Sequence, residues 1–466
     1  MTSAVVHTSM PTGEPDAAHL VFLLYGSRGD VQPGLCLALE SARRGHRVTV
    51  AVPPNLVPLA TAAGVGEVVP IGADTNRQWS SDEAREVQRS AHPLRKATFA
   101  IDTARSGIAA FDDAMMATFL DDDPTIAGVD ALIAAPLCQA RGLAVAERLG
   151  VPLTVLRYAP MSENGLFGPV PGVTDGWTPR WTRRAWRMHD SAVWSVMRHG
   201  ENHFRRRAGL RPVRTACAQR LSLARIPQIQ AYDPGVVPGL AEQWRTGPSI
   251  KPVVGFLDLP SHARATLDET SGADVDLVRW LDAGEPPLFV GFGSMPIADP
   301  AATRATIAAA ARRHGMRCVF AVGGRSRAQG VSSDSGVSSG ADESSDIYDV
   351  GAVNHSWLLP RCSAVMHHGG AGTTAAGLRA GIPAIVYSFT AEQPFWAGRI
   401  ADLGLGTGRR FTRLTIETMV DDLTVARSES VRTAAATFAA TMISADRAVR
   451  TAADIVDVRL PQGVAG

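Results

Sequence analysis

Short apolar runs alternate with helical patterns in the first half of the chain. The run HLVFLLY at residues 19–25 is almost wholly apolar and ends at Gly26, which predicts a strand buried on both faces that leads into a loop. A helix is expected next, beginning near Val31 with Pro33 in its first turn and ending at Gly45. Residues 47–52 read as the following strand, so these segments predict a β-α-β unit.

The same alternation continues to the end of the chain. Further strands are expected at residues 131–135 and 151–156, and a second series at residues 251–256, 287–292, 317–322, 364–366 and 384–387. Two such series predict an α/β fold of two Rossmann-like, doubly wound domains that face each other across a cleft. In such sheets ligands bind beyond the carboxyl ends of the strands.

The length of the chain, 466 residues, also favours two domains over one. We divide it into a flexible N-terminus (1–18), an N-terminal domain (19–235), a Pro/Gly-rich linker (236–250), a C-terminal domain (251–426) and a helical segment (427–466). The helical segment is considered for packing back on the N-terminal domain. Residues 330–346 are rich in Ser, Gly and Asp, predict a surface loop and receive no chemistry.

Charge and cysteine content narrow the classes of function. The net charge of +1 gives no global field for nucleic acid or an anionic membrane. Five cysteines without a CxxC pair suggest neither a disulfide framework nor a zinc site, and no export signal or apolar span is evident, so a cytoplasmic protein is expected. The Trp- and Arg-rich residues 177–214 favour the aromatic wall of a cleft, while transient membrane contact stays open.

The most informative motif is a glycine-rich turn between an apolar run and an Ala-rich helix. Glycines at 369, 370 and 372 allow close backbone approach, and the helix expected from Thr373 offers N–H groups and a dipole that favour an anion. His367 or His368 can donate a hydrogen bond to a phosphate oxygen. The motif therefore indicates a diphosphate site.

Residues 367–373, HHGGAGT, resemble the HxGGxGT donor signature of the family 1 glycosyltransferases, which act on sterols, macrolides, glycopeptides and mycobacterial glycolipids. Three further segments agree in order: GSRGDVQP at 26–33 resembles the opening loop, GFGSM at 291–295 the first donor-lobe loop, and EQPFW at 392–396 the sugar-contacting Asp/Glu-Gln pair. The resemblance covers residues 20 to about 410 and implies the GT-B fold.

The resemblance also implies roles for individual residues. On the donor side His367 contacts the α-phosphate, and the β-phosphate is held by Gly370, Gly372, Thr373 and Ser294. Val353 contacts the base, and Glu392 and Gln393 bind sugar hydroxyls. Relatives often have Asp where this chain has Glu392, which leaves the sugar preference open.

Asp30 stands where many relatives place histidine and where the sterol and glycopeptide branches place a carboxylate. We therefore expect Asp30 to be the general base that deprotonates the acceptor hydroxyl, with Ser27 as acceptor-side support. The alternative is that Asp30 only caps the following helix.

The implied enzyme is an inverting hexosyltransferase that moves a hexose or deoxyhexose from a UDP- or dTDP-sugar to a hydroxyl of a hydrophobic natural product, sterol or glycolipid. No cofactor and no metal are expected, because the carboxylate pairs at residues 121–123 and 274–276 read as solvated or helix-capping groups. A nucleotide-sugar epimerase and a catalytically silent auxiliary protein remain alternatives, as do a monomer and a homodimer.

Overall fold

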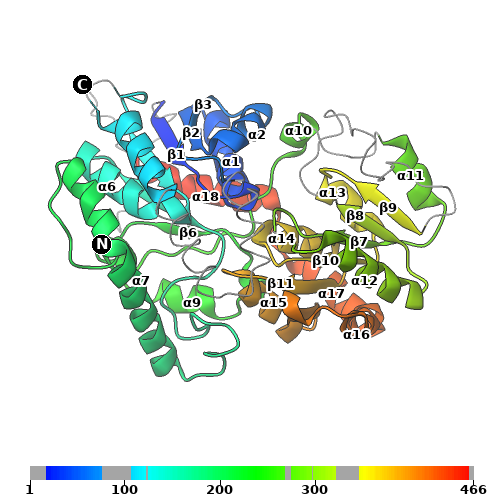
Figure 1. The fold of residues 1–466 in the computed structure, drawn as a ribbon. Coiled ribbons are helices and arrows are strands. Elements are labelled where there is room, and N and C mark those ends of the chain that lie inside the picture. The colour runs from blue at the N-terminus through cyan, green and yellow to red at the C-terminus, as the bar shows by residue number, and fades with distance from the viewer. Residues whose placement is uncertain are drawn as a thin grey trace, which may run out of the picture.

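The computed structural model describes residues 17–75, 107–121, 124–267, 274–295, 297–321 and 346–460. Within these ranges the chain forms two lobes, each built on a six-stranded sheet (Figure 1). The expectations for residues 1–16, for most of the 330–346 loop and for Asp122 and Asp123 lie outside the described residues.

The first sheet is wholly parallel and has the order β3-β2-β1-β4-β5-β6. Its strands are β1 (His19–Leu23), β2 (Arg47–Val52), β3 (Glu67–Pro70), β4 (Ala131–Ala134), β5 (Leu153–Arg157) and β6 (Gln228–Gln230). Every residue of β1 is buried, as its continuous apolar run requires. The strand order reverses direction between β1 and β4, so this sheet has its switch point there.

The second sheet repeats this plan with the order β12-β11-β10-β7-β8-β9, again wholly parallel. Its strands are β7 (Leu288–Gly291), β8 (Cys318–Ala321), β9 (Ile347–Val350), β10 (Ala364–His367), β11 (Ala384–Ser388) and β12 (Gly406–Arg410). Its switch point lies between β7 and β10. The predicted α/β fold of two doubly wound sheets is confirmed.

Helices cover both sheets, as βαβ connections require. The first lobe contains α1 (Arg28–Arg43), α2 (Val57–Ala62), α6 (Gln139–Leu149), α7 (Pro179–Arg207) and α8 (Cys217–Leu223). Between the lobes run α9 (Leu240–Arg245) and α10 (Ser261–Ala265), and the second lobe contains α11 (Val275–Asp282), α12 (Pro300–Arg313), α13 (His355–Leu358), α14 (Ala371–Ala380), α15 (Gln393–Asp402), α16 (Ile416–Arg427) and α17 (Glu429–Thr441). The last described helix is α18 (Ala445–Asp457).

Two expectations about local structure were wrong. Residues 251–256 are not the first strand of the second sheet: this segment runs beside β6 of the first sheet, through an isolated bridge between Gln230 and Val253. Pro252 cannot donate to a ladder, and Gly255 turns the chain away with φ +105°. Similarly, α1 begins at Arg28 and includes Pro33 in its interior, because Ser27 and Asp30 cap the helix a turn earlier than expected.

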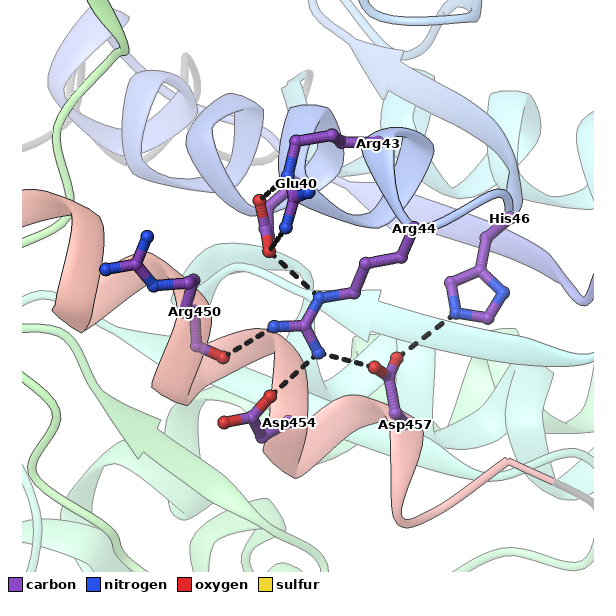
Figure 2. Close-up of polar contacts among 7 residues, drawn as sticks. All are labelled: Glu40, Arg43, Arg44, His46, Arg450, Asp454 and Asp457. Carbon is purple, nitrogen blue, oxygen red and sulfur yellow. Dashed lines mark hydrogen bonds and ion pairs between the residues drawn. The ribbon is translucent and has the colours of Figure 1, made fainter. Parts of the chain in front are cut away.

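The C-terminal helix α18 packs against α1 of the first lobe (Figure 1). Its Ala448, Ala452 and Val456 are buried in the same apolar cluster as residues of β1 and β2. Polar contacts at the end of α1 fix this arrangement, and Figure 2 shows Arg44 at their centre. The Arg44 guanidinium donates to Asp454 at 2.8 Å, to Asp457 at 2.6 Å and to Glu40 at 2.9 Å.

The lobes also share an apolar cluster where they meet. It joins Tyr232, Trp244 and Phe256 to residues of the second lobe such as Val386 and Trp396. Trp244 belongs to α9, so the Pro/Gly-rich segment contains a packed helical turn. Apolar packing in this cluster thus contributes to the contact between the two lobes.

Candidate active site

The two switch points carry most of the residues singled out from the sequence. Ser27 and Asp30 follow β1, while Ser294 follows β7 and His367 ends β10. These four residues therefore stand at the carboxyl edges of central strands, where ligands bind in doubly wound sheets.

Asp30 is held by the start of its own helix. One carboxylate oxygen, Oδ2, accepts from the Ser27 N–H at 2.7 Å and from the Ser27 hydroxyl at 2.8 Å. Gly26 makes room for this contact, since a Cβ at Gly26, where φ is +129°, would lie 2.4 Å from Oδ2. Burial raises the pKa of Asp30, and the hydrogen bonds from Ser27 act in the opposite direction. Asp30 does cap α1, but through one oxygen.

The glycine-rich turn before α14 has two kinds of glycine. Gly369, with φ +90°, and Gly370 are required by the protein itself, because a Cβ would lie 2.9 Å from the Gln393 carbonyl oxygen and 2.5 Å from His368 Nε2, respectively. At Gly372, in the first turn of α14, an added Cβ would have no neighbouring atom within 4 Å. A Cβ at position 372 would therefore meet no other part of the chain, and the first N–H groups of α14, as in any helix, have no partner within the helix.

His367 is fully buried and only half satisfied. Its Nδ1 accepts from the Gly369 N–H at 3.0 Å, so the proton of a neutral ring resides on Nε2. Nε2 has no partner among the described residues. Burial lowers the pKa of His367 to about 3, with smaller contributions from His368 and His355. The side chain is therefore a neutral N–H donor without an acceptor. A buried donor without an acceptor is costly, so a ligand that accepts this hydrogen bond would be favoured.

Glu392 and Gln393 differ in their freedom. Gln393 is 5 % exposed, its amide oxygen accepts from the Phe389 N–H at 2.9 Å, and its Nε2 lies 3.2 Å from Met295 Sδ. Both polar atoms of the Gln393 side chain therefore already have partners in the protein. Glu392 is half-buried and follows Ala391, which has a left-handed φ of 54°. Such strain in a non-glycine residue is common at functional sites.

Two pKa shifts indicate that charged side chains of the two lobes lie near each other. Burial raises the pKa of Glu392 and the charge of Asp30, from the other lobe, raises it further. In the same way burial lowers the pKa of His355 to about 4, with Arg28 of the first lobe contributing to the shift. The motifs did not single out Arg28 or His355 for a role, although Arg28 lies inside the opening loop.

The remaining predicted contacts lie around this space in different ways. Ser294 is exposed at the end of the loop after β7, and Thr373 is half-buried in the first turn of α14. The side chain of Val353 is 7 % exposed and belongs to the core of the second lobe, so only its backbone can face a ligand. Asp274 accepts from the Leu277 N–H at 3.1 Å and caps α11, as expected for this carboxylate.

Two surveys of the described residues complete the picture. Within them no group of three or more His, Cys, Asp or Glu side chains is placed to hold a metal ion. None of the helices that the structure describes combines the length and the apolar character needed to cross a bilayer.

The chain is similar to known glycosyltransferases over most of its length. Residues 341–458 match the family model of the erythromycin biosynthesis protein CIII-like C-terminal domain. An uncharacterized glycosyltransferase of Mycobacterium tuberculosis is 33% identical over 93% of this chain and 97% of its own length. A sterol 3-beta-glucosyltransferase of Arabidopsis thaliana is 30% identical over 92% of this chain and 63% of its own.

Among solved structures, the glycosyltransferase UGT89C1 of Arabidopsis thaliana, complexed with UDP, superimposes with a TM-score of 0.62 at 15% identity, covering 95% of this chain and 99% of the other. At this identity the likeness concerns the fold alone, and it identifies the two facing lobes as the GT-B arrangement. The mycobacterial relative, matched over nearly the whole length of both chains, places this chain in the family 1 glycosyltransferases, and the GT-B fold agrees with this assignment.

Proposed function

We propose that the protein is an inverting glycosyltransferase that transfers a hexose or deoxyhexose from a UDP- or dTDP-sugar to a hydroxyl group of a hydrophobic acceptor. One observation carries this proposal: the buried His367, at the end of β10 and directly before the glycine-rich start of α14, has an Nε2 without a partner among the described residues. Asp30 of the first lobe also lies close enough to contribute to the raised pKa of Glu392. Inversion needs a base and a leaving-group site on either side of the anomeric carbon.

The diphosphate would bind at the start of α14. The helix terminus supplies N–H groups and a favourable dipole, and Gly372 leaves the space that a phosphate oxygen needs. The unpartnered Nε2 of His367 would donate to the α-phosphate without carrying a charge, because the ring is neutral at pH 7. Ser294 and Thr373 border the same turn and would complete the phosphate contacts. These groups can stabilise the departing nucleoside diphosphate with no metal ion.

Asp30 would take the proton from the acceptor hydroxyl. Its Oδ2 is occupied by Ser27, which fixes the rotamer, while no hydrogen bond to Oδ1 is recorded from the described residues. The raised pKa of Asp30 makes its carboxylate a stronger base than that of an ordinary aspartate. The proton passes to Asp30 as the acceptor oxygen bonds to the anomeric carbon, and the bond to the diphosphate oxygen breaks.

The donor and acceptor classes draw support from relatives. The structural neighbour with UDP supports a pyrimidine nucleotide, and UDP and dTDP stay equal candidates here. Glu392 can accept hydrogen bonds from sugar hydroxyls, whereas Gln393 would have to leave its contacts with the Phe389 N–H and Met295 to do so. The sterol-active relative and the erythromycin-type family model support a hydrophobic acceptor with one reactive hydroxyl.

The test is an assay for acceptor-dependent release of nucleoside diphosphate. The protein is incubated with a panel of UDP- and dTDP-sugars, with and without a panel of sterols and macrolide or polyketide aglycones, and the products are identified by mass spectrometry. We expect release of diphosphate only with an acceptor, and a product heavier by one sugar whose anomeric configuration is inverted. Conversion of the sugar nucleotide without an acceptor would favour an epimerase, and no turnover with any pair would favour a silent auxiliary protein.

A further inference from the structure

The helix α7 has an outer face that no other described part of the chain covers. On its inner face Trp186 and Phe204 are 1 % and 0 % exposed, and the Trp186 indole donates to the Phe167 carbonyl at 2.8 Å. On the outer face Trp181, Met188 and Val196 are 57 %, 65 % and 77 % exposed. Exposed large apolar side chains in a single row are unusual on soluble proteins and mark an interaction surface.

The spacing of these residues places them on one face of the helix. Trp181, Met188, Ala192 and Val196 lie within about 80° of one another around the helix axis, and all four are exposed. The helix has 29 residues, so it is about 43 Å long and projects along the edge of the first lobe (Figure 1). The row thus forms an apolar stripe about four turns long.

A second row of cations adjoins the first. Arg180, Arg184, Arg187 and Arg198 are all exposed and lie within about 60° of one another, on one side of the apolar stripe. Among the described residues, an ion pair is recorded for Arg187 alone, to Glu163 at 3.1 Å. The acidic residues of the helix, Asp190 and Glu201, lie on its inner side, and Glu201 is buried against Arg220. We call the eight residues of the two rows the outer face of α7.

We propose that the outer face of α7 binds the surface of an anionic lipid bilayer. Indole, thioether and branched side chains insert at the boundary between headgroups and acyl chains, and arginines alongside them pair with lipid phosphates. The chain as a whole is nearly neutral, with a net charge of +1, so attraction to an anionic surface would come from this local stripe. A second copy that docked through this same face would bring arginine row against arginine row, and like charges repel.

Such a contact would be reversible and dependent on charge. Each arginine near an anionic surface strengthens binding by about fivefold, so the loss of two should weaken it by about 25-fold. Salt should weaken it as well, because the arginines are exposed and screened within about 10 Å at 0.1 M salt. The proposal does not rest on sugar transfer and applies to the protein whatever its acceptor.

The test is co-sedimentation of the full chain with vesicles of phosphatidylcholine alone or mixed with phosphatidylglycerol. We expect binding to the mixed vesicles that weakens with added NaCl, and little binding to phosphatidylcholine. Arg184→Gln/Arg198→Gln and Trp181→Ser/Met188→Ser should each bind at least tenfold more weakly. The control Val275→Ser/Arg279→Gln removes an equally exposed pair from α11 (65 % exposed Val275, 62 % exposed Arg279 side chain) and should bind as the unaltered protein does.

Several outcomes would overturn the proposal. One is salt-independent binding or equal binding to both vesicle types by the unaltered protein. Another is equal weakening by the control and the two α7 variants. Self-association in sedimentation velocity that Trp181→Ser/Met188→Ser abolishes, without vesicle binding, would assign the face to a second copy. Far-UV circular dichroism checks the fold of each variant, and turnover of a water-soluble acceptor, measured in parallel, separates failure of this surface from failure of the proposed activity.

Discussion

The open space above Gly372 can be tested by filling it with one methyl group. Gly372→Ala adds a Cβ that meets no atom within 4 Å apart from its chain neighbours and the backbone of its own helix, so the folded protein can accept it without a clash. Because alanine is the better helix former, the free energy of unfolding should stay the same or rise by up to about 1 kcal/mol. A bound phosphate, however, would meet the new methyl group. Losing one close hydrogen bond to a charged oxygen costs about 1.5–3 kcal/mol, which is about 10- to 150-fold in Kd.

The matched control is Gly398→Ala in α15, another helical glycine whose added Cβ meets nothing within 4 Å. Isothermal titration calorimetry with UDP and with dTDP measures the affinities, and urea unfolding measures the stability. We expect both variants to be at least as stable as the unaltered protein and only Gly372→Ala to lose nucleotide affinity. If Gly372→Ala and Gly398→Ala bind both nucleotides equally well, the diphosphate does not lie on the first turn of α14.

Four further predictions address other contacts. His367→Ala should weaken UDP or dTDP binding by about 10- to 150-fold. Because burial lowers the pKa of His367 to about 3, the difference in affinity between the variant and the unaltered protein should stay constant from pH 5 to 8. Calorimetry that shows this difference growing below pH 6.5 would mean that the histidine is charged. Arg44→Ala should lower the free energy of unfolding by about 2 kcal/mol, because it leaves Glu40 and Asp457 without this partner. Arg43→Ala removes a 66 % exposed side chain that pairs with the same glutamate, and it should lower the free energy of unfolding by less than about 1 kcal/mol. Equal unfolding midpoints of the two variants in urea would show that α18 is held by apolar packing alone. On the acid side kcat/KM should fall with a midpoint above about 3.9, the ordinary value for aspartate, because burial raises the pKa of Asp30 and the protonated form is no base; a pH profile that stays flat down to pH 4 would argue against this role. Turnover should persist in EDTA, since the helix terminus and His367 can neutralise the diphosphate; a loss of activity that added Mg²⁺ restores would contradict this.

The strands that are buried on both faces could be predicted from the sequence. Strands 47–52 and 364–367 were expected within one residue, because parallel strands buried on both faces leave continuous apolar runs. The segment 251–256 carries the same apolar signal, yet it lies beside β6 of the other lobe. An apolar run shows that a segment is buried, but the partner that buries it is set by tertiary contacts.

Those site residues that belong to one continuous sequence motif could be predicted from the sequence. Residues 367–373 and 27–30 could be placed at strand ends because a strand precedes each of them. The engagement of Gln393 with Phe389 and Met295, and the influence of Arg28 on His355 across the lobes, could not be read from spacing. The Met295 contact and the influence of Arg28 depend on where distant segments meet, whereas the Phe389 contact depends on the local turn that leads into α15. The start of α1 at Arg28 was missed because the capping contact between Ser27 and Asp30 outweighs the preference of Pro33 for a first turn.

The central claim, that Asp30 removes the acceptor proton while the other lobe holds the diphosphate, is tested most directly with Asp30→Asn. The asparagine oxygen can still accept from Ser27, so the cap of α1 is kept and only the base is lost. The measurement is the single-turnover rate of sugar transfer with donor at saturation, alongside donor Kd. We predict an unchanged Kd and a transfer rate lower by about 10²- to 10⁴-fold. A transfer rate close to that of the unaltered protein would contradict the account and leave Asp30 with its capping role alone.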